Sequence, residues 1–333
     1  MKTIKILLIT ISCIGIYACS DDNNDRFQPV IAEDLEFFED GEVEMLFDNA
    51  GADGITMVFI GDGYIKEDLG KIYGTYKPDA ERYFEYLFSI EPFASYQEHF
   101  NAAIVYTESQ SRTIPEGIEN ADSSALEAYT YIGWTGSGLY EANPERINFY
   151  KNKLPTGYQN NSNTLIVLNE LGGGNTSFES DVAFSGSASE STMIHEVGHS
   201  FGGLGDEYEL QIQNTPNVSF RPNLDNTDDL THIKWSHFID LPGYQNVGAY
   251  EGGGYVSTGV WRPQIESIMR GGSTIFADQF NAPSREAIVK KIYRIRGIPY
   301  DFGTFLANDI VTRNAIPISE KTKNIYVPVG CLQ

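Results

Sequence analysis

The chain has 333 residues, which allows one large or two ordinary domains. Hydrophobic residues make up 41% and charged residues 21%, so the composition excludes a disordered protein and supplies enough apolar material for a sizeable core. The formal net charge of −23 argues against a nucleic-acid-binding protein, because phosphates would be repelled, and it gives no attraction to anionic lipid.

The first nineteen residues, MKTIKILLITISCIGIYAC, have the pattern of an export signal. Lys2 and Lys5 precede an apolar run over residues 6–16, which is shorter than the roughly 20 residues of a membrane-spanning helix. The end of the stretch, IYAC, resembles the lipobox of bacterial lipoproteins, in which the cysteine is acylated and becomes the mature N-terminus. We therefore expect a signal peptide over residues 1–18 and an acylated Cys19, the alternative being an ordinary signal with an incidental cysteine.

The segment after Cys19, SDDNND, resembles the acidic tether of some Gram-negative lipoproteins that are exported to the outer face. It predicts an outer-membrane lipoprotein of a Gram-negative bacterium, exposed on the cell surface and attached only through its lipid. Cys13 would leave with the signal, so Cys331 would be the one remaining thiol and no internal disulfide could form. The fold must then be stabilised by its core.

Residues 19–50 are expected to form the lipidated tether and a lead-in, in which one amphipathic stretch could add an edge strand or hairpin. The predicted elements that follow are a buried strand at 55–60, a helix carrying Tyr83, Phe84, Leu87 and Phe88 and broken at Pro92, strands within 100–109 and 163–171, the motif helix described below, and a late helix at 282–297 with Ser284 near its N-cap. Alternating strands and helices predict one α/β or α+β catalytic domain over residues 51–300. Residues 301–333 are expected to be a C-terminal extension that packs on this domain.

The stretch STMIHEVGHSFGGLGDEYE, at residues 191–209, places two histidines four residues apart with a glutamate beside the first. His195 and His199 would lie one helical turn apart, so both imidazoles project from one face and can meet one zinc ion. Glu196 can reach the water on the open coordination position without binding the metal, which is the role of a general base. Zinc lowers the pKa of such a water towards ~7, so the motif predicts a hydrolase.

The alternative is a chance occurrence of this pentapeptide on a surface helix. Four apolar residues argue against it, because they would cover the other faces and bury the helix, where unpartnered histidines would be costly. These residues are Met193, Ile194, Val197 and Phe201. Gly202, Gly203 and Gly205 then permit a sharp turn that can bring a third ligand to the same ion, and Asp206 and Glu207 follow directly.

The sequence HEVGHSFGGLGDEY resembles the signature of the IgA peptidase family of zinc metallopeptidases, which extends a metzincin-like HExxHxxG motif with an L-x-D-E-Y ending. Three further stretches are similar to this family: MVFIGDGY to its first strand, LIVLNELGGG to its substrate-flanking edge strand, and ESIMRGG with PSREAI to its methionine turn and following helix. The resemblance covers about residues 53–297. It implies a metzincin-like zinc peptidase domain with a mixed sheet, an active-site helix and a methionine turn.

The resemblance also implies roles for single residues. Met269 would form the methionine turn beneath the metal without bonding to it, a core methionine in a loop being the alternative. Asn169 and the glycines after it would line a cleft in which an extended peptide adds to the strand edge. Tyr208 could orient a ligand or hydrogen-bond the oxyanion, with a buried structural tyrosine as the alternative.

The third metal ligand is open between several acids. The commoner metzincin pattern has a histidine ten residues after the first, where this sequence has a glycine. Asp206 is one residue further on, and the resemblance favours its carboxylate as the ligand. Glu207 is the nearest rival and would otherwise buttress the loop, while Glu251 or Glu266 could contribute from a later element.

Together these observations predict a secreted, lipid-anchored zinc metalloendopeptidase that acts as a monomer on extended peptides, with Glu196 as general base. The alternatives are a protein- or glycan-binding surface lipoprotein with a peptidase-derived fold, which intact Glu196 disfavours, and a zinc hydrolase of a non-peptide bond. A calcium site is unsupported, because GDG at 61–63 is too short for a calcium loop. The substrate is open between immunoglobulin A and other host or dietary proteins.

Overall fold

The computed structural model describes residues 36–133, 138–170, 173–176, 181–186, 190–210, 215–270 and 279–309. The predicted signal peptide, Cys19, the acidic tether and Cys331 lie outside the described residues. The described strands are β1 (Val43–Asp48), β2 (Ile55–Asp62), β3 (Phe100–Val105), β4 (Tyr129–Ile132), β5 (Gly138–Glu141), β6 (Ser162–Leu168), β7 (Gly174–Thr176), β8 (Val182–Gly186), β9 (Tyr250–Gly253) and β10 (Val256–Arg262). The described helices are α1 (Tyr76–Leu87), α2 (Pro144–Lys151), α3 (Glu190–Ser200), α4 (Ala282–Ile295) and α5 (Phe302–Asn308), with shorter 3-10 turns between them.

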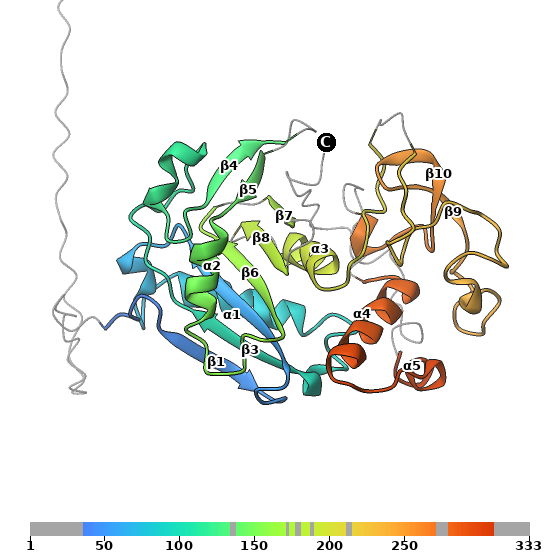
Figure 1. The fold of residues 1–333 in the computed structure, drawn as a ribbon, viewed down its shortest axis with the longest axis horizontal. Coiled ribbons are helices and arrows are strands. Elements are labelled where there is room, and N and C mark those ends of the chain that lie inside the picture. The colour runs from blue at the N-terminus through green and yellow to red at the C-terminus, as the bar shows by residue number, and fades with distance from the viewer. Residues whose placement is uncertain are drawn as a thin grey trace, which may run out of the picture. The chain divides into compact units, whose positions relative to one another are not determined.

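The main sheet of the described chain has six strands in the order β1-β3-β2-β6-β8-β7 (Figure 1). Strands β3, β2, β6 and β8 run parallel, whereas the outer strands β1 and β7 pair antiparallel with their neighbours. Every residue of β2 is buried, which explains why its sequence is a continuous apolar run instead of an alternating one. The fold is therefore a mixed α/β architecture, as the alternation of strands and helices in the sequence predicted.

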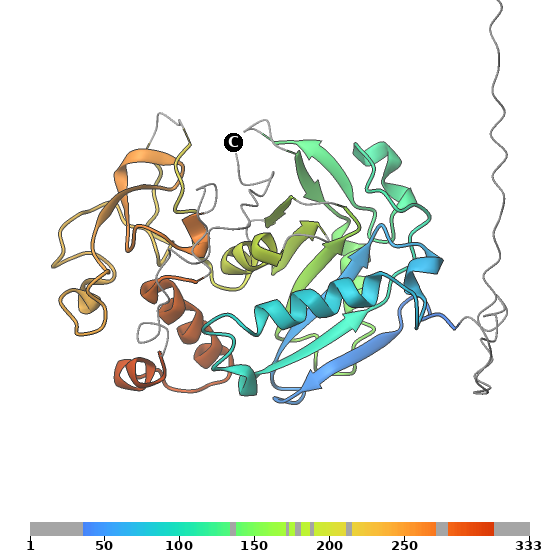
Figure 2. The same ribbon diagram turned by 180° about the vertical axis from the view of Figure 1, so that it is seen from behind.

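Helices cover both faces of this sheet. The α2 helix lies on the face turned to the viewer in Figure 1, and α1 lies on the opposite face, which Figure 2 shows. The larger hydrophobic core lies on the α1 side and also takes side chains from α3 and α4. A smaller core fills the space under α2. The α3 helix contacts β7 and β8 at one side of the sheet, so it lies between the sheet and the segment that contains β9, β10 and α4 (Figure 1).

One detail differs from the sequence-based expectations. The strand with the sequence LIVL, β6, lies between β2 and β8, so it is central, and the described edge strand on this side is β7. The amphipathic stretch of the lead-in contributes β1 as an edge strand of the main sheet, as expected. The N-cap of α4 is Asn281, whose side chain accepts a hydrogen bond from the Ser284 backbone N–H at 3.0 Å. No helix in the described ranges combines the length and the apolar character needed to cross a membrane.

Candidate metal centre

The HExxH segment lies on α3, and its apolar side chains are buried as expected. Gly198 lets the later segment that contains Met269 approach this helix closely, because a Cβ at this position would overlap the sulfur of Met269. Met269 is fully buried in a short 3-10 turn, Ile268–Arg270. Its thioether therefore packs against the helix that carries both histidines, a placement that a methionine turn and a core methionine share.

Three potential ligand atoms converge beside α3. The Nε2 atoms of His195 and His199 are 3.1 Å apart, and each lies 3.0 Å from Oδ1 of Asp206. All three residues are buried. Within the described residues, they form the one group of three or more histidine, cysteine or acidic side chains that could hold a metal ion. The structure thus brings Asp206 to the two histidines and does not bring Glu207, Glu251 or Glu266 there.

Backbone carbonyls fix the orientation of both imidazole rings. His195 Nδ1 lies 2.9 Å from the carbonyl oxygen of Ile268, and His199 Nδ1 lies 2.8 Å from that of Leu204. A carbonyl oxygen only accepts, so both Nδ1 atoms must carry the proton and donate it. The Nε2 atoms of the neutral rings then direct lone pairs at each other and at the Asp206 carboxylate. This is the arrangement that metal-binding histidines adopt when a second partner sets their tautomer.

The donor set fits a divalent cation. Two imidazole lone pairs and one carboxylate oxygen repel one another unless a positive charge lies between them. Ligand atoms about 2.0–2.1 Å from a tetrahedral zinc are roughly 3.3 Å apart, close to the separations of 3.0 to 3.1 Å found here.

A glycine turn returns the chain from α3 to the metal centre. Gly203 has φ +67°, a conformation that side chains other than glycine rarely adopt. Its N–H donates to the carbonyl of His199 at 3.0 Å, which closes the helix. Beyond it, Asn223 holds the extended segment by bonding the N–H and the C=O of Gly205 at 2.7 and 2.8 Å. The sharp turn expected from the glycines is present, and it delivers Asp206 from outside the helix.

Glu207 points away from the histidines and anchors the same segment. Its buried carboxylate accepts hydrogen bonds from Ser267 Oγ at 2.5 Å, Asn223 Nδ2 at 2.7 Å and Asn281 Nδ2 at 2.6 Å. Burial raises the pKa of Glu207, against the effect of these three donors. Glu207 was considered as a metal ligand or as a support of the loop, and these hydrogen bonds favour the supporting role.

The remaining acid of the motif, Glu196, is buried on α3 one residue after His195. Thr176, on the edge strand β7, donates its hydroxyl to Glu196 Oε2 at 2.6 Å and also lies 2.9 Å from the Glu196 carbonyl oxygen. The sequence gives no spacing signal for Thr176, because it reaches Glu196 through the packing of α3 on the sheet. It fixes the direction in which the Glu196 carboxylate points.

Two tyrosines line the other side of the centre. The ring of Tyr208 lies 6.3 Å from the His195 ring with an interplanar angle of 28°, and 5.4 Å from the ring of Tyr255. Tyr255 donates its hydroxyl to Oδ2 of Asp206. Burial, reinforced by the carboxylate of Asp206, raises the pKa of Tyr255 far above its ordinary value, so the hydroxyl stays protonated. Sequence reasoning considered Tyr208 for such a role and did not find Tyr255.

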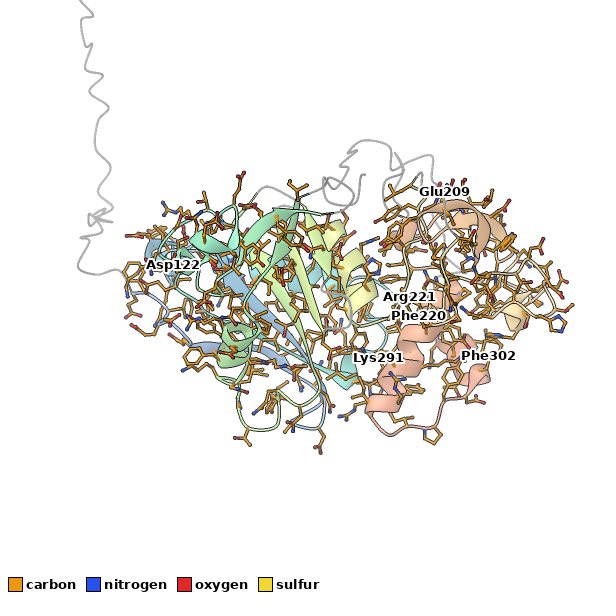
Figure 3. All side chains as sticks on the ribbon, turned by 45° about the horizontal axis from the view of Figure 1, so that its top comes forward. Asp122, Glu209, Phe220, Arg221, Lys291 and Phe302 are labelled. Carbon is orange, nitrogen blue, oxygen red and sulfur yellow. The ribbon has the colours of Figure 1, made fainter. Side chains whose placement is uncertain are left out.

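A cationic side chain also lies close to the centre. Arg221, labelled in Figure 3, donates Nη1 to the carbonyl oxygens of Gly203 and Leu204, both at 3.3 Å. The Leu204 carbonyl is the one that orients His199. Arg221 thus helps to hold the turn, and burial lowers its pKa although the charge of Asp206 acts in the opposite direction.

Comparison with models of protein families identifies a family for this chain. A family model described as IgA Peptidase M64 matches residues 43–243. The matched segment includes α3, the glycine turn and Asp206, and it stops before Tyr255 and Met269. No curated protein shows a significant match to the chain.

Proposed function

Because the chain belongs to the IgA peptidase M64 family, we propose that it is a zinc metalloendopeptidase that hydrolyses peptide bonds of extracellular proteins. The observation that carries the proposal is the convergence of two imidazole nitrogens and one carboxylate oxygen, within 3.1 Å of one another, beside a buried glutamate on the same helix. Three protein ligands with one open position are typical of catalytic zinc sites, whereas structural sites have four.

His195, His199 and Asp206 would hold the ion, which when bound supplies a Lewis acid and lowers the pKa of its water to about 7. Glu196 then accepts the proton of the attacking water and returns it to the amine that leaves. Thr176 fixes the orientation of the Glu196 carboxylate for this proton transfer through its hydrogen bond to Oε2. The three ligand residues and Glu196 are buried, which keeps bulk water from screening the charges of the ion and the carboxylates.

We further propose that an extended peptide binds along β7. This strand is the last described strand on its side of the sheet, and it carries the threonine that contacts Glu196. A peptide that adds to such an edge gains main-chain hydrogen bonds independent of its sequence and would pass the general base. Asn169, which was expected to line the cleft, donates its side-chain amide to the Gly63 carbonyl at 2.9 Å and joins two strand ends.

The proposal includes attachment to the outer membrane through an acylated Cys19, with the enzyme acting as a monomer at the cell surface. Its support is the sequence pattern of the export signal and the acidic SDDNND segment. Cys19→Ala should release the protein from the membrane fraction, since one or two acyl chains would be its only hydrophobic anchor. A variant that still sediments with membranes would contradict the lipid anchor, and protease treatment of intact cells tests surface exposure separately.

The catalytic proposal is tested by incubating the purified protein with a mixed peptide library, with and without a chelator. We expect cleavage that the chelator abolishes and that added zinc restores, and the cut sites would give the specificity. Glu196→Ala is the matched control, because it should bind zinc and cleave far more slowly than wild type. Stoichiometric zinc binding without cleavage of any peptide would favour the binding lipoprotein or a zinc hydrolase of another bond.

A further inference from the structure

The two oxygens of Asp206 have separate partners. Oδ1 faces both histidine Nε2 atoms at 3.0 Å, so it is the oxygen placed to bind the ion. Oδ2 accepts the hydrogen bond from the hydroxyl of Tyr255. Asp206 is only 5% exposed, so this division is set by protein groups and not by bulk water.

Tyr255 is held in place by its backbone as well as by this bond. Its φ of +71° is unusual for a tyrosine and persists only where the surroundings determine it. Its N–H donates to the Tyr208 carbonyl at 3.1 Å, and its own carbonyl accepts from the Leu210 N–H at 2.9 Å. These two bonds join Tyr255, at the turn between β9 and β10, to the segment that carries Asp206. The hydroxyl therefore keeps a fixed position relative to that carboxylate.

We propose that Tyr255 is a positioning residue that reserves Oδ2 of Asp206 and so limits this carboxylate to a single metal bond, through Oδ1. The inference rests on the proposed function. Carboxylates bind cations through one oxygen or through both. A second oxygen from Asp206 would raise the coordination number from four to five and crowd the position that a catalytic zinc site keeps for water. Tyr255 thereby keeps that position available to the water that Glu196 deprotonates.

The test replaces zinc by cobalt(II) and compares wild type with Tyr255→Phe. The variant keeps the ring and removes only the oxygen that bonds Asp206. The visible absorption of cobalt(II) weakens as its coordination number rises from four to five. We expect the variant to bind cobalt with an affinity within about tenfold of wild type, below the 10- to 100-fold loss typical when a partner of a ligand is removed, but with weaker visible bands.

Tyr244→Phe is the matched control, because the Tyr244 hydroxyl also donates to a buried aspartate, Asp309, at 2.9 Å. It should show the wild-type cobalt spectrum. Identical spectra for wild type and Tyr255→Phe would overturn the inference, as would a loss of cobalt affinity well beyond tenfold, which would make Tyr255 a support of the loop.

The outcome is separable from that of the proposed function. Cobalt bound by wild type without any peptidase activity would contradict the proposed catalysis and leave the spectral comparison valid. A wild-type protein that binds neither cobalt nor zinc would contradict the metal centre itself. If activity is present, we expect Tyr255→Phe to lower kcat and to leave KM near the wild-type value, because the change affects the attacking water and not the peptide.

Discussion

Asp309 and Asp206 are both buried aspartates, and each accepts a hydrogen bond from a tyrosine hydroxyl. Asp309 also accepts two hydrogen bonds from the guanidinium of Arg285, at 2.7 and 2.8 Å, so the chain itself supplies the opposite charge. Asp206 instead faces the Nε2 atoms of two imidazole rings, and the Nδ1 atom of each ring already donates to a backbone carbonyl. The same side chain therefore serves as part of an internal ion pair in one region and as a ligand that needs an external cation in the other.

This comparison shows that burial of an acid does not by itself indicate a binding site. What distinguishes the two regions is whether the protein supplies the compensating charge. The ion pair joins Arg285 on α4 to Asp309, the residue just after α5, and the two side-chain charges compensate each other. At Asp206 the balance is incomplete without a cation. Variants at these sites should accordingly separate stability from metal binding.

Glu196→Ala should have the largest effect, on activity alone. A general base contributes roughly 10²- to 10⁴-fold to a rate, so kcat should fall by about that factor. Zinc content should stay at one ion per chain, because Glu196 does not belong to the group that converges on the ion. Steady-state kinetics measure the fall in kcat, and metal analysis measures the zinc content. A variant purified without zinc would make Glu196 a ligand.

Asp309→Ala should reduce stability and leave zinc affinity unchanged. Removing one partner of a buried ion pair typically costs about 3–5 kcal/mol, because the remaining charge is left without compensation. Urea or thermal unfolding measures this loss. The double variant Arg285→Met, Asp309→Leu should recover most of it, since apolar replacements often match such pairs. A fall in zinc affinity comparable to that of Asp206→Ala would break the contrast between the two aspartates.

Asp206→Ala should weaken zinc binding by about 100- to 1000-fold, which is the share of one ligand in the roughly 10–16 kcal/mol that four ligands provide. Glu207→Ala should have a much smaller effect, because Glu207 only anchors the segment. Competition with a chelator at fixed pH gives both affinities. Equal values for wild type and Asp206→Ala would move the third ligand to another residue.

Asp62 extends the comparison to a buried carboxyl group that has neutral donors. Burial raises its pKa from 3.8, although Ser124, Ser109 and two backbone N–H groups donate to it. The folded state thus binds this proton more tightly than the unfolded chain does. The stabilising contribution is present below pH 3.8 and is lost as the pH rises through the folded-state pKa.

Asp62→Asn removes this titration and is expected to give the smallest effect. The stability of wild type relative to the variant should fall as the pH increases above 3.8, by at most about 1.4 kcal/mol per pH unit for one proton. Urea unfolding of both proteins across this range measures the slope. A relative stability that increases with pH would reverse the assigned direction of the pKa shift.

Much of the centre could be predicted because it is local in sequence. His195, Glu196, His199 and Asp206 lie in one short segment, and helical geometry relates the first three without knowledge of the fold, whereas Asp206 was preferred over the other acids only with the family resemblance. Long-range partners have no such rule. Tyr255 reaches Asp206 from the turn between β9 and β10, a hairpin that shows no strong apolar pattern in the sequence.

The fold shows the same division. The long apolar runs of β2, β3 and β6 and the helical spacing of α1 and α4 identify these elements from sequence. Strand β7, which is three residues long and begins with glycine, leaves no recognisable pattern, and the family resemblance placed the LIVL strand, β6, at the edge instead. Strand order depends on which elements pack together, and the residues of one strand do not encode it.

The anchoring of Glu207 determines what happens when the metal is lost. Its carboxylate joins the segment next to Asp206 to Asn223, Ser267 and Asn281, which come from three separate parts of the chain. Small zinc domains, in contrast, unfold when the ion leaves, because the metal is what organises them. Here three hydrogen bonds that do not involve the ion should hold the ligand segment whether or not zinc is bound. Where zinc is scarce, we therefore expect the proposed peptidase to stay folded but inactive, and to regain activity on zinc binding without refolding.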